Sequence, residues 1–254
     1  MSRLARPSVV LGALLLAGCA AGPGGPHGRG RALRPVAQPT DVIATEIAFA
    51  RAAREEGQWT AFADYAADDA VMFVPQAVNA RDWLRGRADP PVPERWATRE
   101  AWSSCDGSAV LVAGIGTDSA GTWSRFTRVW RRQDNGRQRW VYTMSVPDPT
   151  LAQARQDREQ ARSDTPAADE NAILVEASSF IRAKVADCTV PPGMPLPGDS
   201  PEGAAGGQTA MSRDSTLQWR WHTDAENRGS LAAYFWTGTG WDMVVSEGAA
   251  PPAG

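Results

Sequence analysis

Residues 57–75 read GQWTAFADYAADDAVMFVP, and this stretch decides the fold that we expect. Trp59 and Phe62 stand at helical spacing after a glycine, which predicts a short helix. Asp68-Asp69 then predicts a turn, and Ala70 to Val74 predicts an apolar strand that ends at a proline. A short helix followed at once by a strand is the beginning of an α+β pattern.

The flanking segments predict two more helices. Upstream, residues 40–57 favour a helix with Thr40 as the N-cap and Gly57 as the stop. At about 100° per residue, one broad face of this helix is apolar. That face carries Val42, Ile43, Ile47, Phe49, Ala50 and Ala53. Downstream, Asn79 to Arg85 predicts a third short helix.

A run of strands follows a proline-rich stretch at 90–93. The strand-like segments are 101–105, 108–116, 122–132 and 137–144, and turn signals such as Asp134-Asn135-Gly136 separate them. Helices followed by a meander predict an α+β domain over 39–148, in which the helices pack on one face of a curved antiparallel sheet.

The rest of the chain is expected to form an all-β extension. Residues 149–171 are polar and predict a linker or a solvated helix. The region 172–247 is expected to be a β-rich lobe, with one long strand or a strand pair at 173–188 and further strands at 217–222, 231–236 and 241–245. Proline and glycine at 189–213 predict a disordered loop. The lobe is too small to stand alone, so it should extend the first sheet or pack against it.

The amino terminus carries an export signal. Residues 1–6 are positively charged, and the apolar run that follows is too short to span a bilayer. Leu16-Ala17-Gly18-Cys19 resembles the lipobox of bacterial lipoproteins. The resemblance implies that residues 1–18 are a signal peptide and that acyl chains such as palmitate are attached at Cys19. With Ala20 next, it also implies an outer-membrane protein facing the periplasm. Residues 19–38 then form a flexible tether.

Composition excludes several classes of function. The 254 residues have a net charge of −3 and no basic patch with interleaved aromatics, so we expect no nucleic-acid partner. His27 and His222 are the only histidines, and no cysteine spacing is typical of zinc, so no metal or other cofactor is predicted. With Cys19 acylated, Cys105 and Cys188 either form a disulfide in an oxidising compartment or remain two buried thiols.

The order of helix, short helix, strand, short helix and meander resembles the nuclear transport factor two-like fold, also called ketosteroid-isomerase-like or SnoaL-like. The residues that carry the resemblance are Glu46-Ile47-Ala48-Phe49, the 57–62 segment, Asp69 to Pro75, Arg125 to Trp130, and Arg139-Trp140. They are similar to an uncharacterised bacterial branch of this superfamily. The resemblance implies a cone-shaped domain, and it does not specify a reaction because this fold hosts both enzymes and binding proteins.

Glu46 is the most informative polar position. It falls at the centre of the apolar helix face, where a carboxylate must be paired or must line a cavity. One interpretation is a base or ligand-binding group inside the cone. The other is a structural carboxylate that accepts bonds from a tryptophan indole or an arginine. Arg128 is the candidate partner, because it alternates in phase with Trp130 toward one face of its strand. Tyr65 could present its hydroxyl to the same cavity.

Three functions compete. The first is a lipid-anchored envelope protein that is not an enzyme and binds a small apolar ligand or a protein partner in the cone. The second is an isomerase- or dehydratase-like enzyme with Glu46 as the general base. The third is a structural envelope protein whose β-rich lobe completes the sheet. Nothing in the sequence indicates an oligomeric state.

Overall fold

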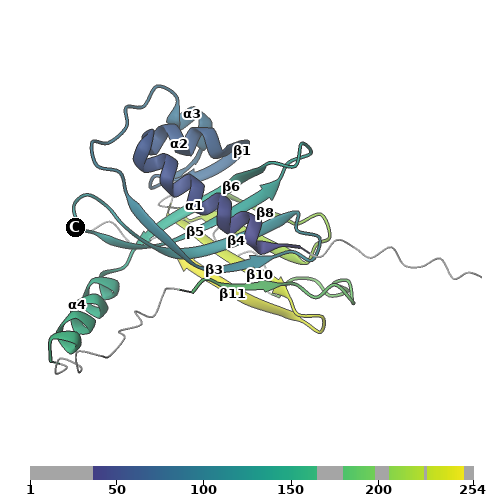
Figure 1. Ribbon diagram of the computed structural model, residues 1–254. Helices are drawn as coiled ribbons and strands as arrows, with labels where there is room; N and C mark the ends of the chain where they lie inside the picture. Colours follow the sequence, from purple (N-terminus) through teal and green to yellow (C-terminus); the bar gives the residue numbers. More distant parts are fainter. Residues whose placement is uncertain (1–36, 165–179, 198–205, 226–227, 249–254) are drawn as a thin grey trace, which may run out of the picture. The chain divides into compact units, whose positions relative to one another are not determined.

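The computed structural model describes residues 37–164, 180–197, 206–225 and 228–248 (Figure 1). The predictions for the signal peptide, Cys19 and the tether lie outside these residues. The helices are α1 (Pro39–Glu55), α2 (Gln58–Tyr65), α3 (Ala80–Leu84) and α4 (Pro149–Asp164). The strands are β1 (Ala66–Phe73), β2 (Ala77–Asn79), β3 (Arg95–Ser103), β4 (Ala109–Thr117), β5 (Trp123–Arg132), β6 (Gln138–Pro147), β7 (Arg182–Val185), β8 (Gly206–Met211), β9 (Leu217–Thr223), β10 (Gly229–Trp236) and β11 (Trp241–Gly248).

The first helix begins two residues earlier than predicted. Pro39 occupies the first helical turn and Gln38 is the N-cap, so Thr40 is inside the helix and does not cap it. Proline suits this position because its missing N–H would be unsatisfied there in any case. The predicted apolar face is correct for Val42, Phe49 and the alanines, whereas Ile47 is 63% exposed. Its position lies at the margin of the face, and α1 turns that margin away from the sheet.

The second helix is capped by a residue distant in sequence. Gly57 has φ 121°, and the carboxylate of Asp89 accepts bonds from the backbone N–H groups of Trp59 and Thr60 and from the Thr60 hydroxyl. A Cβ at Gly57 would collide with the Asp89 carboxylate, so the site requires glycine. The predicted turn at Asp68-Asp69 is wrong. Strand β1 already includes both residues as exposed positions, beside an irregularity in its pairing with β6.

Seven strands form the first sheet in the order β2-β1-β6-β5-β4-β3-β7. Strands β3 to β6 make the predicted antiparallel meander, and the sheet as a whole is mixed because β1 joins β6, and β7 joins β3, in parallel. Phe126, Arg128 and Trp130 point to the side on which α1 lies, as their contacts with Glu46 and Phe49 show. The structure confirms the α+β class, with helices on a curved sheet and a C-terminal all-β extension.

The C-terminal strands form a second sheet in the order β11-β10-β9-β8. Of the strand or strand pair predicted at 173–188, the described part contains the short strand β7, whose pairing with β3 covers four residues, and residues 173–179 lie outside the described ranges. The prediction of a loop throughout 189–213 is wrong, because strand β8 lies within it and pairs with β9 despite its two glycines. Gly207 permits this pairing, because a Cβ there would lie 2.4 Å from the backbone oxygen of Trp221.

The second sheet packs on the face of the first that is opposite to α1. Glu247 of β11 lies against Thr127 and 4.0 Å from Arg125, which alternate with the residues that face the helix. The ring of Phe73 in β1 packs edge-on against Trp221 of β9. Buried residues of both sheets form one continuous hydrophobic core. The β-rich extension therefore shares its core with the first sheet.

Candidate functional site

A buried ion pair stands at the centre of the cone. Glu46 and Arg128 have 2% and 3% of their side chains exposed, and one guanidinium nitrogen, Arg128 Nη1, lies 2.9 Å from both carboxylate oxygens. Two indoles add to the pair. Trp130 Nε1 donates to Glu46 Oε1 at 2.6 Å, and Trp96 Nε1 donates to Oε2 at 3.2 Å.

This arrangement suits a structural carboxylate better than a base. The partners named above are all hydrogen-bond donors, and together they occupy both oxygens of Glu46. A general base needs an oxygen that can reach substrate, whereas both oxygens of Glu46 are already bonded inside the core. The guanidinium of Arg128 is held between aromatic rings, with the Phe49 ring centre 4.6 Å away and that of Phe126 5.1 Å away. These contacts fix the pair on the scaffold.

A small cavity of about 100 Å³ adjoins the ion pair. Its walls come from α2, the end of β1 and the strands β3, β5 and β6. Aromatic and apolar side chains form most of them, namely Trp59, Phe62, Met72, Phe73, Val74, Trp96 and Phe126. The polar groups are Gln58, Glu94, Arg128, Thr143 and Ser145. Glu46 does not line it and instead borders a separate pocket of about 280 Å³, to which Arg54 and Trp96 also contribute.

Glu94 is the polar residue that the sequence analysis missed. It precedes β3, and its backbone N–H donates to Gln58 Oε1 at 2.8 Å. Gly116 leaves room for its side chain, since a Cβ there would lie 2.6 Å from Glu94 Oε1. Burial raises the pKa of the Glu94 carboxyl, while Arg128 and the donating hydroxyl of Ser124 partly offset this effect. In the sequence, Glu94 stands two residues before Trp96, so both side chains would point to the same face of a strand. This spacing is the one signal that could have indicated Glu94.

Arg128 lines the cavity and has one unsatisfied donor. Within the described part of the chain, its buried Nε has no hydrogen-bond partner. A buried unsatisfied donor is costly, and a hydrogen bond to a charged guanidinium is stronger than one between neutral groups. The hydroxyl of Ser145 donates to that of Ser124 at 3.1 Å, which links the exposed end of the cavity to Glu94. The cavity thus combines an apolar wall with one donor and one carboxyl.

The remaining candidate residues lie elsewhere. Trp130 is fully buried and is bonded to Glu46, so it supports the site from behind. Tyr65 packs on Phe49, with ring centres 5.0 Å apart, and its polar end lies in a separate groove. Cys105 and Cys188 are joined by a disulfide with their Cα atoms 5.3 Å apart.

Two further classes of site find no candidate in the described residues. Histidine, cysteine and acidic side chains there form no cluster of three or more that could hold a metal ion. His222 contacts the hydroxyl of Ser230 on the neighbouring strand, and neither residue lines the cavity. None of the helices in the described part of the chain has the length and apolar character needed to span a bilayer.

No family model and no curated protein matches this chain. Several solved structures resemble part of it. A protein of unknown function from Pseudomonas aeruginosa, described as nuclear transport factor 2-like, is 20% identical over 41% of this chain and 97% of that chain, with a TM-score of 0.31. An uncharacterized protein from Caulobacter vibrioides with a cystatin-like fold is 15% identical over 48% of this chain and 98% of its own, with a TM-score of 0.34.

A third resemblance is to a Mycobacterium tuberculosis protein in complex with estradiol-17β-hemisuccinate. It is 12% identical over 45% of this chain and 98% of that chain, with a TM-score of 0.33. The steroid derivative is a ligand of the mycobacterial protein. At these identities and TM-scores the resemblances transfer neither a ligand nor a reaction to this chain.

Proposed function

We propose that this protein is a non-catalytic binding protein, anchored by lipid at Cys19 to the cell envelope, which holds a small and largely apolar ligand in the cavity beside Arg128. The observation that carries the proposal is that Arg128 lines an aromatic cavity and has a buried Nε without an acceptor among the described residues. A ligand with one acceptor atom would be bound by this guanidinium group.

The cavity limits the size of this ligand. Ligand sites usually enclose about 300–1,000 Å³, and an apolar cavity of about 150 Å³ is large enough for benzene. A space of about 100 Å³ is smaller than this, so a single small ring would enter it only in part, from the end at which Ser145 is exposed. Phenol is a suitable probe, because its ring would stand against the aromatic wall and its oxygen would lie toward Arg128 or Glu94.

A second candidate function follows from Glu94. Its raised pKa brings the carboxyl closer to neutrality, as general acids and bases require, and Arg128 on the same cavity could stabilise a developing negative charge. An isomerase- or dehydratase-like reaction would then use Glu94 in place of the buried Glu46. In the binding function, by contrast, Glu94 only contributes a polar contact.

Blocking the cavity tests the binding function. In the parent protein, phenol should shift the indole N–H resonance of Trp96, which lines the cavity. Ser145→Trp should abolish the shift by closing the exposed end, and Glu94→Gln should weaken binding about tenfold or less, as expected for one polar contact. Ser246→Trp, an exposed change on β11, is the matched control and should bind normally.

The same variants separate the two functions. If the protein converts a substrate and Glu94→Gln retains binding but loses turnover, the cavity is an active site and the non-catalytic proposal is wrong. If phenol and related single-ring alcohols bind the parent and Ser145→Trp equally, the ligand does not enter this cavity.

Lipid anchoring has its own test. Cys19→Ser should move the protein out of the detergent-extracted membrane fraction, because two or more acyl chains provide the anchor. Mass spectrometry of the parent's amino-terminal peptide should show Cys19 with its acyl groups and without residues 1–18. Ala20→Ser is the matched control and should remain in the membrane fraction. An unmodified Cys19 peptide would contradict the anchor.

A further inference from the structure

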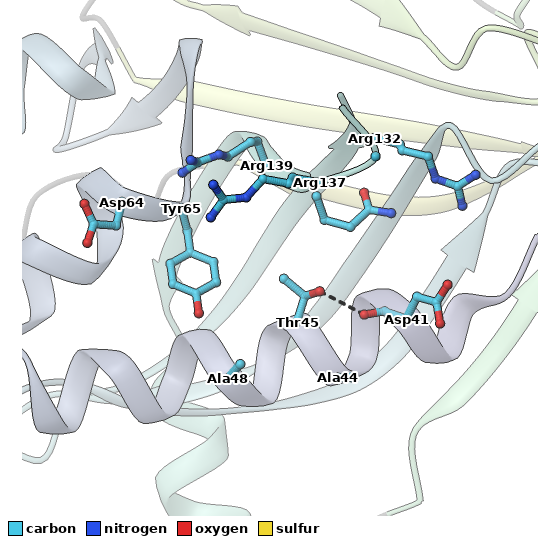
Figure 2. A pocket seen from close by; sticks show the side chains of 11 residues that line it. Asp41, Ala44, Thr45, Ala48, Asp64, Tyr65, Arg132, Arg137 and Arg139 are labelled. Atoms are coloured by element: carbon cyan, nitrogen blue, oxygen red, sulfur yellow. Dashed lines mark hydrogen bonds between the residues drawn. The ribbon is translucent and has the colours of Figure 1, made fainter. Parts of the chain in front are cut away.

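A second and larger groove, of about 1050 Å³, lies on a different part of the first sheet from the Arg128 cavity. It is bounded by the first turns of α1, the end of α2 and the turn between β5 and β6 (Figure 2). Three arginines line it, namely Arg132, Arg137 and Arg139. Tyr65 and Thr45 add hydroxyl groups, and Ala48 forms part of the floor. We call this the arginine groove.

The three arginines are not paired with carboxylates of the described residues. Two neighbouring arginines do have such partners. Arg131, which precedes Arg132 on β5, is bonded to Asp69 at 2.7 Å, and Arg81 lies 3.0 Å from Asp68. By contrast, no acidic side chain of the described ranges comes within 4.0 Å of the guanidinium nitrogens of the groove. Asp64 is also at the groove, and Figure 2 shows its carboxylate directed away from Arg137 and Arg139.

Two of these cations extend in the same direction. Figure 2 shows the side chains of Arg137, in the turn before β6, and of Arg139, in β6, directed toward Tyr65. Partial burial, followed by the positive charges of Arg137 and Arg81, lowers the pKa of Arg139, while the charges of Asp64 and Asp68 partly offset this effect. Because neither Arg137 nor Arg139 makes an ion pair with a described residue, an anion between them would be attracted by both.

The backbone that carries the pair is well fixed. Arg137 accepts a bond from Gln133 N–H at 2.8 Å and donates its own N–H to Asn135 Oδ1 at 3.0 Å. The ring of Tyr65 is packed against Phe49 and Trp130, so its hydroxyl has a defined position at the groove. Rigid elements of this kind keep binding groups in place before the ligand arrives.

We propose that the arginine groove binds a phosphate monoester, with the phosphate between Arg137 and Arg139 and the rest of the ligand extending along α1 toward Arg132. The planar fork of arginine matches phosphate oxygens in bidentate fashion. A phosphate monoester carries a charge of about −1.5 to −2 near pH 7, enough for two cations, whereas a carboxylate carries one. The volume of the groove exceeds that of phosphate alone.

Two sources can supply this chemistry. One is a free phosphorylated small molecule, and the other is a lipid with a phosphate monoester headgroup. Asp41 and Thr45, in the first turns of α1, border the groove, and α1 follows the segment that leads back to Cys19. A polypeptide spans at most about 3.3–3.6 Å per residue. With lipid attached at Cys19, as proposed above, this segment would keep the groove within reach of the lipid headgroups. This site is separate from the Arg128 cavity and does not depend on its function.

The test uses the full chain carrying Cys19→Ser, and titrates it with glycerol 1-phosphate and with acetate. Replacing Arg137 and Arg139 together by glutamine should weaken glycerol 1-phosphate binding about tenfold or more, because charge-assisted hydrogen bonds are lost. Arg54→Gln with Arg95→Gln removes the same charge from exposed positions outside the groove, and should bind like the parent. Tight binding of the phosphate and not of acetate supports the proposal.

Vesicles distinguish the two sources. The same proteins are mixed with phosphatidylcholine vesicles that contain either phosphatidic acid or phosphatidylglycerol. Binding to the phosphatidic acid vesicles alone, lost in the Arg137/Arg139 variant, assigns a lipid headgroup, and binding of only the soluble ester assigns a free ligand. The proposal is overturned if neither form binds, if acetate binds as well as the phosphate, or if the Arg137/Arg139 variant and the Arg54/Arg95 control bind equally.

Discussion

Arg128→Leu is expected to lower the free energy of unfolding by about 3–5 kcal/mol, the range measured when one partner of a buried ion pair is removed. The substitution would leave the Glu46 carboxylate in the core with only the indoles of Trp96 and Trp130 as donors. The loss should appear in urea unfolding followed by circular dichroism, as a lower midpoint with an unchanged slope.

Two comparisons make this result specific. Arg131→Leu, on the same strand, removes one partner of a pair in which both side chains are largely exposed, so it should cost about 1 kcal/mol or less. The double substitution Glu46→Leu with Arg128→Leu should recover much of the stability lost by Arg128→Leu alone, because no unpaired charge remains. Equal losses of unfolding free energy for Arg128→Leu and Arg131→Leu would show that the buried Glu46–Arg128 pair contributes no more to stability than an exposed ion pair.

Glu46 and Arg128 could be identified from the sequence because local periodicity was enough. A carboxylate at the centre of an apolar helix face and an arginine in phase with two aromatics on a strand are each anomalies of one element. Their meeting across 82 positions follows once the helix lies on that face of the sheet. The same local pattern was enough to suggest a structural role for Glu46, because indole N–H groups and arginine are the donors that such a core can offer a carboxylate.

Glu94 could not be identified in this way, because its burial comes from distant segments. Gln58 holds its backbone from 36 positions away, and the space for its side chain exists because Gly116 has no Cβ. The sequence around it is polar, so the strand that it precedes was predicted to begin at residue 101 and begins at Arg95. Pairing with β4 on one side and with β7 on the other, rather than local propensity, makes this segment a strand.

The second sheet also contains strands that could be predicted from the sequence and one that could not. Alternation predicted β9, which has one buried face. Strands β10 and β11 were predicted as the rest of the same meander. Alternation did not reveal that β8 completes them, since the two glycines of that strand read as loop. Nor did it decide whether the strands extend the first sheet or cover it. That choice depends on contacts such as Phe73 with Trp221, which alternation within a single strand does not encode.

Removing the disulfide is expected to have the second large effect. Cys105 and Cys188 are separated by 83 positions, and the loop-closure model gives about 4–5 kcal/mol for a loop of that length at 25 °C. The double substitution Cys105→Ala and Cys188→Ala should therefore lower the free energy of unfolding by several kcal/mol. Alanine is the suitable replacement, because Cys105 is 1% exposed and a serine hydroxyl there would be buried.

The disulfide joins the segments that follow β3 and β7 at the edge of the first sheet, next to Thr216 of the second, and its removal should loosen this edge first. Backbone contacts beside it remain available, since Cys105 N–H donates to Thr216 Oγ1 at 2.9 Å and Ala186 N–H donates to Ser103 O at 2.9 Å. Hydrogen exchange should accordingly rise first in β7 to β11 and later in β4 to β6. Dithiothreitol should reproduce the loss of stability in the parent and leave the alanine variant unchanged. If reduction frees both thiols without lowering the urea midpoint, the neighbouring hydrogen bonds suffice by themselves, and the disulfide does not make the loop-closure contribution.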